Sequence, residues 1–186
     1  NPAFDATFLA EGVGCAACHV RDGLIVSTRA VPNAPHPVVK SSELGSSAFC
    51  ANCHQLSFPE SDQPFYNTYG EWKATPYATN GVRCQDCHMP PKAGAATATR
   101  FAASPDHTAS ANLGRALTVL IDLEHATLQR GATTLIKITV LNTGAAHHVP
   151  TGNPSNTLDL KVGLFDEEGV PVTEEHHEIL SRTVQQ

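Results

Sequence analysis

The sequence has few basic residues, no long apolar segment and no recognisable export signal at its start. Its 186 residues include 12 Lys and Arg against 18 Asp and Glu, which gives a formal net charge of -6. Because phosphate backbones are bound by clusters of Lys and Arg, this balance argues against a nucleic-acid partner. No run of about 18 apolar residues occurs, so the sequence predicts no membrane-spanning helix.

The first residues also lack the two features of a secretory signal peptide. The stretch Asn1-Pro2-Ala3-Phe4 opens the chain without a charged segment followed by an apolar one. We expect a mature, exported chain whose signal is absent from this sequence, located in the periplasm or outside the cell.

Cysteine and histidine, by contrast, are abundant and ordered. All six cysteines fall in three copies of the pattern Cys-x-x-Cys-His, which are Cys15–His19, Cys50–His54 and Cys84–His88. This pattern is typical of covalent c-type haem attachment. Two thiols at this spacing reach the two vinyl groups on one edge of a porphyrin, and the histidine that follows ligates the iron from one face. The sequence therefore predicts three haem c groups.

The attachment residues follow directly from the motifs. The predicted thioether cysteines are Cys15, Cys18, Cys50, Cys53, Cys84 and Cys87. The predicted proximal iron ligands are His19, His54 and His88.

Zinc sites and disulfides are the competing interpretations of paired cysteines. Zinc sites use Cys-x-x-Cys motifs in pairs, which leaves one of three copies without a partner. Neither zinc binding nor a set of local disulfides explains a histidine directly after every second cysteine. The haem interpretation accounts for all nine residues.

Seven further histidines are available as second iron ligands. Met89 is the one methionine, and because it adjoins His88 it cannot reach the iron that His88 binds. Met89 remains an alternative ligand for another haem, but histidine is the expected second ligand. Iron with two imidazoles has no open position, so it transfers electrons and does not bind substrate.

Three of these histidines are the predicted distal ligands. His36 lies between two prolines, which stiffen its loop, and His107 follows the third motif. His147 and His148 are neighbours in an extended stretch, so at most one faces a given haem. His125, His176 and His177 are expected to be surface residues, the last two among glutamates, with a minor alternative of weak metal binding.

The chain divides by composition into two predicted domains. Residues 1–110 are rich in Pro, Gly, Ala, Ser and Asn and show no long amphipathic helix. We expect short helical turns around the motifs, with Glu71-Trp72-Lys73 near another. Aromatic residues make up 6% of the chain, so haems are expected to supply most of the apolar core of this trihaem domain.

Residues 111–186 have the alternating pattern of antiparallel strands. Apolar residues recur at every second position in three runs, 117–123, 136–140 and 158–164, and a fourth strand is expected from Val170 to about Val184. Such strands suit a small β-sandwich of immunoglobulin-like type. A full sandwich has about seven strands, so we expect the sheet to be completed by a partner or by further chain.

The motif surroundings resemble a known family. The resemblance rests on Asn67-Thr68-Tyr69, Glu71-Trp72, Pro76-Tyr77-Ala78 and Cys84-Gln85-Asp86-Cys87-His88-Met89-Pro90. These stretches are similar to bacterial multihaem cytochromes c related to the cytochrome c554 group. The stretch from His147 to Gly152 is similar to the start of a C-terminal β module found in such proteins. The resemblance implies closely packed bis-histidine haems and favours His147 over His148 as the ligand.

Three functions fit these features. The leading expectation is an electron carrier that relays electrons through three haems to redox partner proteins or neighbouring haem subunits, and not an enzyme. The alternatives are a protomer of an extracellular cytochrome filament or another homo-oligomer, or a fixed haem subunit of a larger complex. A reductase of small nitrogen or sulfur species is less favoured because it needs an open iron position.

Overall fold

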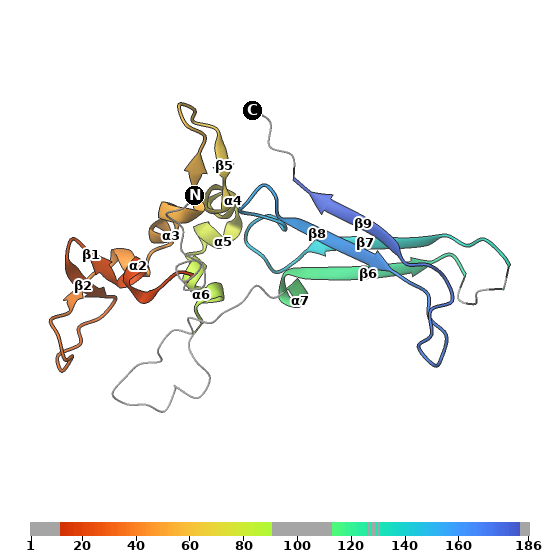
Figure 1. The fold of residues 1–186 in the computed structure, drawn as a ribbon, viewed down its shortest axis with the longest axis horizontal. Helices are drawn as coiled ribbons and strands as arrows, with labels where there is room; N and C mark the ends of the chain where they lie inside the picture. Colours follow the sequence, from red (N-terminus) through yellow and green to blue (C-terminus); the bar gives the residue numbers. More distant parts are fainter. Residues whose placement is uncertain (1–11, 91–112, 126, 128, 130, 183–186) are drawn as a thin grey trace, which may run out of the picture. The chain divides into compact units, whose positions relative to one another are not determined.

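The computed structural model describes residues 12–90, 113–125, 127, 129 and 131–182 (Figure 1). The chain forms two compact units, Asn1–Cys50 and Ala51–Gln186. The predicted boundary between residues 110 and 111 lies outside the described residues, as do His107 and the start of the chain.

The first unit consists of short elements that surround the first motif. They are α2 (Cys15–His19), β1 (Val20–Arg21), β2 (Leu24–Ser27), β3 (Val39–Lys40), a 3-10 helix (Glu43–Gly45) and the first turn of α3 (Ser47–His54). Strand β2 lies in the middle of the small sheet, antiparallel to β1 and parallel to β3.

A tight hairpin joins β1 to β2. Asp22 and Gly23 have φ values of 49° and 75°, the left-handed pair that two-residue hairpin turns require. The Asp-Gly sequence supplies this turn, and it places Val26 of β2 inside the unit. Val26 is the buried apolar residue of the described chain.

The second unit begins with the end of α3 and continues through short helices. Its first part contains β4 (Leu56–Ser57), β5 (Pro64–Tyr66), α4 (Thr68–Lys73), α5 (Pro76–Thr79) and α6 (Cys84–His88). The predicted helical turns at the three motifs and at Glu71-Trp72-Lys73 are thus confirmed. Helices of four to eight residues are not stable alone, so contacts with their surroundings must hold them.

Two antiparallel strand pairs form the second part of this unit (Figure 1). After α7 (Leu113–Ala116), β6 (Leu117–Leu123) pairs with β7 (Ile136–Asn142), and β8 (Thr157–Val162) pairs with β9 (His176–Ser181). Strands form at all four predicted runs, and the fourth begins at His176 instead of Val170. The immunoglobulin-like sandwich stays a prediction.

Apolar side chains remain exposed in both parts of the chain. Within the described residues, Ser47 and Glu71 are the polar residues that are buried, and Val26 is the apolar one. Exposed apolar residues lie along β6, including Val119, Leu120 and Ile121. No helix in the described ranges is long and apolar enough to cross a membrane.

Candidate functional site

Each Cys-x-x-Cys-His motif lies on a short helix that ends at its histidine. Helices α2 and α6 coincide with the first and third motifs, and α3 contains the second in its last five residues. None of the six cysteines, all of which lie in the described residues, takes part in a disulfide bond. Helical spacing presents both thiols of a motif near one edge, as thioether attachment requires.

A backbone carbonyl fixes the ring of the first motif histidine. Nδ1 of His19 lies 2.8 Å from the carbonyl oxygen of Val26 in β2. When Nδ1–H donates to a carbonyl, the tautomer is set and Nε2 becomes the metal-binding nitrogen. The β1–β2 hairpin therefore orients the ring of His19, the predicted iron ligand of the first motif.

The third motif histidine lies opposite His147. The ring centres of His88 and His147 are 5.9 Å apart and their planes differ by 16°. Two bonds of about 2 Å from one metal ion to two imidazole nitrogens, with the remaining distance to each ring centre, span about 6 Å. The separation of the ring centres and their near-parallel planes are thus compatible with one iron bound between the two rings.

Electrostatics at His88 also suit a ligand. Neighbouring atoms displace water from its ring, although the residue stays exposed overall, and this desolvation lowers the pKa of His88. His147 and His54 lower that pKa further by charge repulsion. A lowered pKa favours the neutral imidazole, which is the form that binds metal.

The loop that presents His147 begins at the end of β7. The side-chain amide of Asn142 donates to the carbonyl of His147 at 2.7 Å, and its oxygen accepts from the N–H of Ala145 at 3.0 Å. Nδ1 of His147 lies 2.8 Å from the carbonyl of His148, which leaves Nε2 as its metal-binding nitrogen. The side chain of His148 is 78% exposed, whereas His147 is partly buried.

Helix α4 holds the surroundings of this pair together. Gln55, which follows the second motif, donates to Asn67 at 3.0 Å and accepts from the N–H of Gly70 at 2.9 Å. The indole of Trp72 donates to the carbonyl of Val82 at 3.0 Å, just before the third motif. Helix α4 and its N-cap Asn67 are therefore hydrogen-bonded to Gln55, just after α3, and to Val82, just before α6.

The third motif helix is capped locally. The N–H of Arg83 donates to Asp86 at 2.8 Å, and the guanidinium donates to the same carboxylate at 2.6 Å. These bonds to Arg83 hold the pKa of Asp86 below its usual range and raise the pKa of Arg83. Because both side chains are more than one-third exposed, we expect only a small stabilisation of α6.

The other histidines singled out by the sequence lie on the surface or outside the described residues. His36 is exposed and lines a pocket formed by its own proline-rich loop, Val31–Val38. His107 lies outside the described residues. His177 lies in an exposed strand, 3.3 Å from Glu175 and 3.8 Å from Asp159, as expected for a charged surface. The described residues include no group of three or more His, Cys, Asp or Glu positioned to hold a metal ion.

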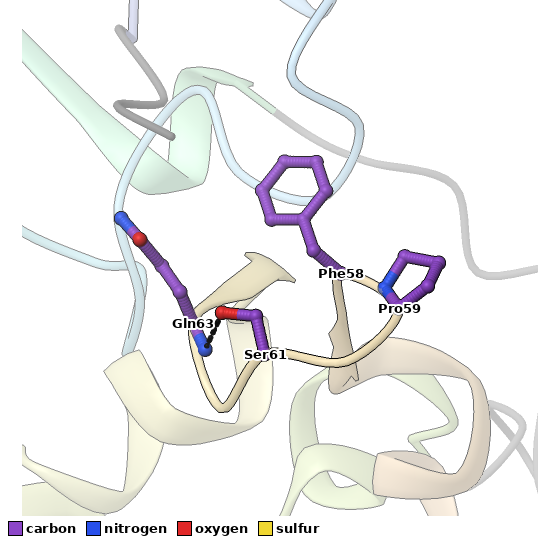
Figure 2. Close-up of a pocket in the computed structure, with 4 residues that line it drawn as sticks. All are labelled: Phe58, Pro59, Ser61 and Gln63. Atoms are coloured by element: carbon purple, nitrogen blue, oxygen red, sulfur yellow. Dashed lines mark hydrogen bonds between the residues drawn. The ribbon is translucent and has the colours of Figure 1, made fainter.

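A second pocket lies at the tip of the β4–β5 hairpin. Its lining residues are Phe58, Pro59, Ser61 and Gln63, and Figure 2 shows the hydrogen bond from Gln63 to Ser61. None of the predicted haem residues lines it. The pocket is therefore separate from the motif residues.

Sequence reasoning missed the residues that support His147. Glu71, Asn142 and Arg182 were not expected near the predicted ligand His147, and the structure brings all three to the loop that carries it. The glutamate did fall in a recognisable stretch, Glu71-Trp72, but nothing local signals that its carboxylate is buried.

Comparison with known proteins bears on the same region. Residues 34–118 match the N-terminal region of the NapC/NirT cytochrome c family. The match supports a multihaem c-type cytochrome family. Such a family implies covalently bound haem c and an electron-transfer role. No curated protein and no solved structure matches the chain significantly.

The match covers part of the predicted haem apparatus. It includes the second and third motifs, His36 and His107, and it excludes the first motif and His147. It names a different cytochrome family from the resemblance noted above, and both are multihaem c-type cytochromes.

Proposed function

We propose that this chain is an electron-transfer protein that relays electrons through three covalently bound, bis-histidine c-type haems. The pairing of His88 with His147 carries the proposal, because it sets a motif histidine against a second imidazole at the spacing of a shared iron. When bound, haem c would supply a one-electron iron couple, and two imidazoles on each iron would leave no position for substrate.

The chain's residues would divide this work among them. The six motif cysteines would hold the porphyrins, and His19, His54 and His88 would bind the irons. His147 completes the third site, and His36 and His107 are proposed for the other two. The carbonyl of Val26 and the carbonyl of His148 orient two of the rings through Nδ1.

The proposed setting is outside the cytoplasm. Covalent haem attachment through both cysteines is made on exported chains, and the cytochrome c match is consistent with this location. The net charge of -6 favours a positively charged redox partner and an association that weakens with salt.

One observation favours an additional role in assembly. Each of the sheets β6–β7 and β8–β9 has two strands in the described part of the chain, so strand edges remain unpaired there. Exposed Val119, Ile121 and Leu123 line β6. Strand addition from a neighbour would cover such an edge, as in a filament or a larger redox complex.

Intact mass and optical spectra together test the electron-transfer proposal. We expect the mature holoprotein to carry the mass of three haems, and its reduced spectrum to stay unchanged under carbon monoxide because every iron is six-coordinate. A mass with fewer haems would contradict the haem count. A carbon monoxide shift would instead reveal an open iron and favour the reductase alternative.

A further inference from the structure

We infer that Glu71 is a positioning residue: its buried carboxylate fixes the peptide group that follows His147 and so holds that imidazole opposite His88. The inference rests on the proposed haem ligation by His88 and His147. Glu71 lies on α4, and its side chain is 4% exposed. Such a carboxylate persists only where its oxygens are satisfied.

One oxygen of Glu71 binds the ligand loop directly. Oε2 accepts the N–H of His148 at 3.1 Å and the hydroxyl of Thr151 at 2.6 Å. Thr151 in turn lies 2.9 Å from the hydroxyl of Thr68, one helical turn before Glu71 on α4. The same face of α4 therefore contacts the loop at two points.

These bonds clamp a single peptide group. The carbonyl of His147 accepts from Asn142 at 2.7 Å, and the N–H of the same peptide bond donates to Glu71. With both polar ends fixed, rotation of this peptide would cost two hydrogen bonds. Because the ring of His147 is bonded to the next carbonyl, its direction follows from the same clamp.

The other oxygen of Glu71, Oε1, lies near a positive charge. Oε1 lies 3.3 Å from the guanidinium of Arg182, just after β9, and Arg182 also donates to Gly152 at 2.9 Å and to Phe65. Arg182 thus compensates the buried charge and ties the far end of the loop to β5. A glutamine would turn its NH₂ group toward either Arg182 or His148, and one side would lose its acceptor.

Glu71→Gln in the holoprotein tests the inference. The substitution keeps the size of the side chain, so we expect intact mass to show an unchanged number of haems. We expect one haem in three to become high-spin in the ferric state and to bind carbon monoxide in the ferrous state. Added imidazole should restore the low-spin spectrum by filling the open iron position, whereas general destabilisation would open more than one haem.

Two controls localise the effect. Glu168→Gln alters an exposed glutamate in the turn between β8 and β9 and should leave the spectrum unchanged. In a Cys84→Ser/Cys87→Ser background, which lacks the third thioether pair, Glu71→Gln should add no carbon monoxide binding. Asn142→Ala releases the other end of the same peptide and should reproduce the signature if Glu71→Gln protein is not obtained.

The outcomes separate the inference from the proposed function. A wild-type protein without haem on the third motif, or with that haem already open to carbon monoxide, would overturn both. A wild type with three closed haems, combined with unchanged spectra in Glu71→Gln and Asn142→Ala, would overturn the inference alone.

Discussion

His147 and His148 are neighbours in sequence but differ in what surrounds them. The ring of His147 lies 5.9 Å from His88 and is partly buried, whereas the side chain of His148 is 78% exposed. The Nδ1 atom of His148 lies 3.4 Å from Glu71, so its ring faces the carboxylate. Of these two rings, that of His147 is the one paired with the motif histidine His88 in the described residues.

Replacing each histidine by alanine distinguishes the two. In His147→Ala we expect one haem in three to lose its second imidazole, become high-spin and bind carbon monoxide, because the cysteines still hold the porphyrin. In His148→Ala the low-spin spectrum should persist. Carbon monoxide binding by His148→Ala alone would reverse the assignment of the ligand.

Sequence patterns predicted the motif residues but not the residues that hold His147 in place. The cysteines, the proximal histidines and the choice of His147 follow from spacing and family resemblance, since each is a local pattern. The burial of Glu71 depends on Thr151 and Arg182, which lie 80 and 111 residues further along the chain. No local pattern carries that information, because tertiary contact alone creates it.

At the scale of elements, the strands were easier to predict than the small hairpins. Alternating apolar and polar residues mark β6, β7 and β8, whose six or seven residues are enough for a period of two to show. The β1–β2 and β4–β5 hairpins have strands of two to four residues, too short for a period to show. Asp22-Gly23 was the one local signal that would have found the first of them.

The end of the β6–β7 hairpin depends on a close backbone approach at Gly144. The N–H of Gly144 and that of Thr143 both donate to the carbonyl of Ala116 at 3.0 Å. A Cβ added to Gly144 would lie 1.9 Å from the carbonyl oxygen of Arg115. That oxygen belongs to the backbone, so it cannot move aside as a flexible side chain would.

We expect Gly144→Ala to destabilise the protein by about 1–3 kcal/mol, as overpacking does, measured by denaturant unfolding followed by circular dichroism. Gly163→Ala is the matched control, because its nearest atoms belong to the exposed ring of Phe165, which can turn away. Its cost should be smaller. Equal losses in the two variants would show that the approach at Gly144 does not matter.

At the scale of the whole molecule, the described residues form almost no apolar core. Among the described residues Val26 is the apolar one that is buried, while Tyr77, Leu56 and many strand residues remain exposed. Conformational entropy costs about 1–2 kcal/mol per ordered residue, which polypeptide burial on this scale does not offset. Covalently attached porphyrins would supply the missing apolar surface.

We therefore expect the apoprotein, produced without haem attachment, to lack a cooperative unfolding transition. Circular dichroism during heating should show a gradual change for the apoprotein and a sharp transition for the holoprotein at the same concentration. Loss of structure should extend through the helices α2 to α6, because each has eight residues or fewer and cannot persist alone.

The strand pairs allow a second comparison between the apoprotein and the holoprotein. The β6–β7 ladder joins seven residues on each side, but an isolated two-stranded hairpin is marginal in water. Glu71 and Arg182 link this region to α4, so loss of the haem-bearing helices should also loosen the loop that carries His147. Amide exchange at β6 and β7 should then be faster in the apoprotein than in the holoprotein. Equal protection in both forms, or a sharp melting transition without haem, would mean that the polypeptide holds its own fold and that haem serves only the redox chemistry.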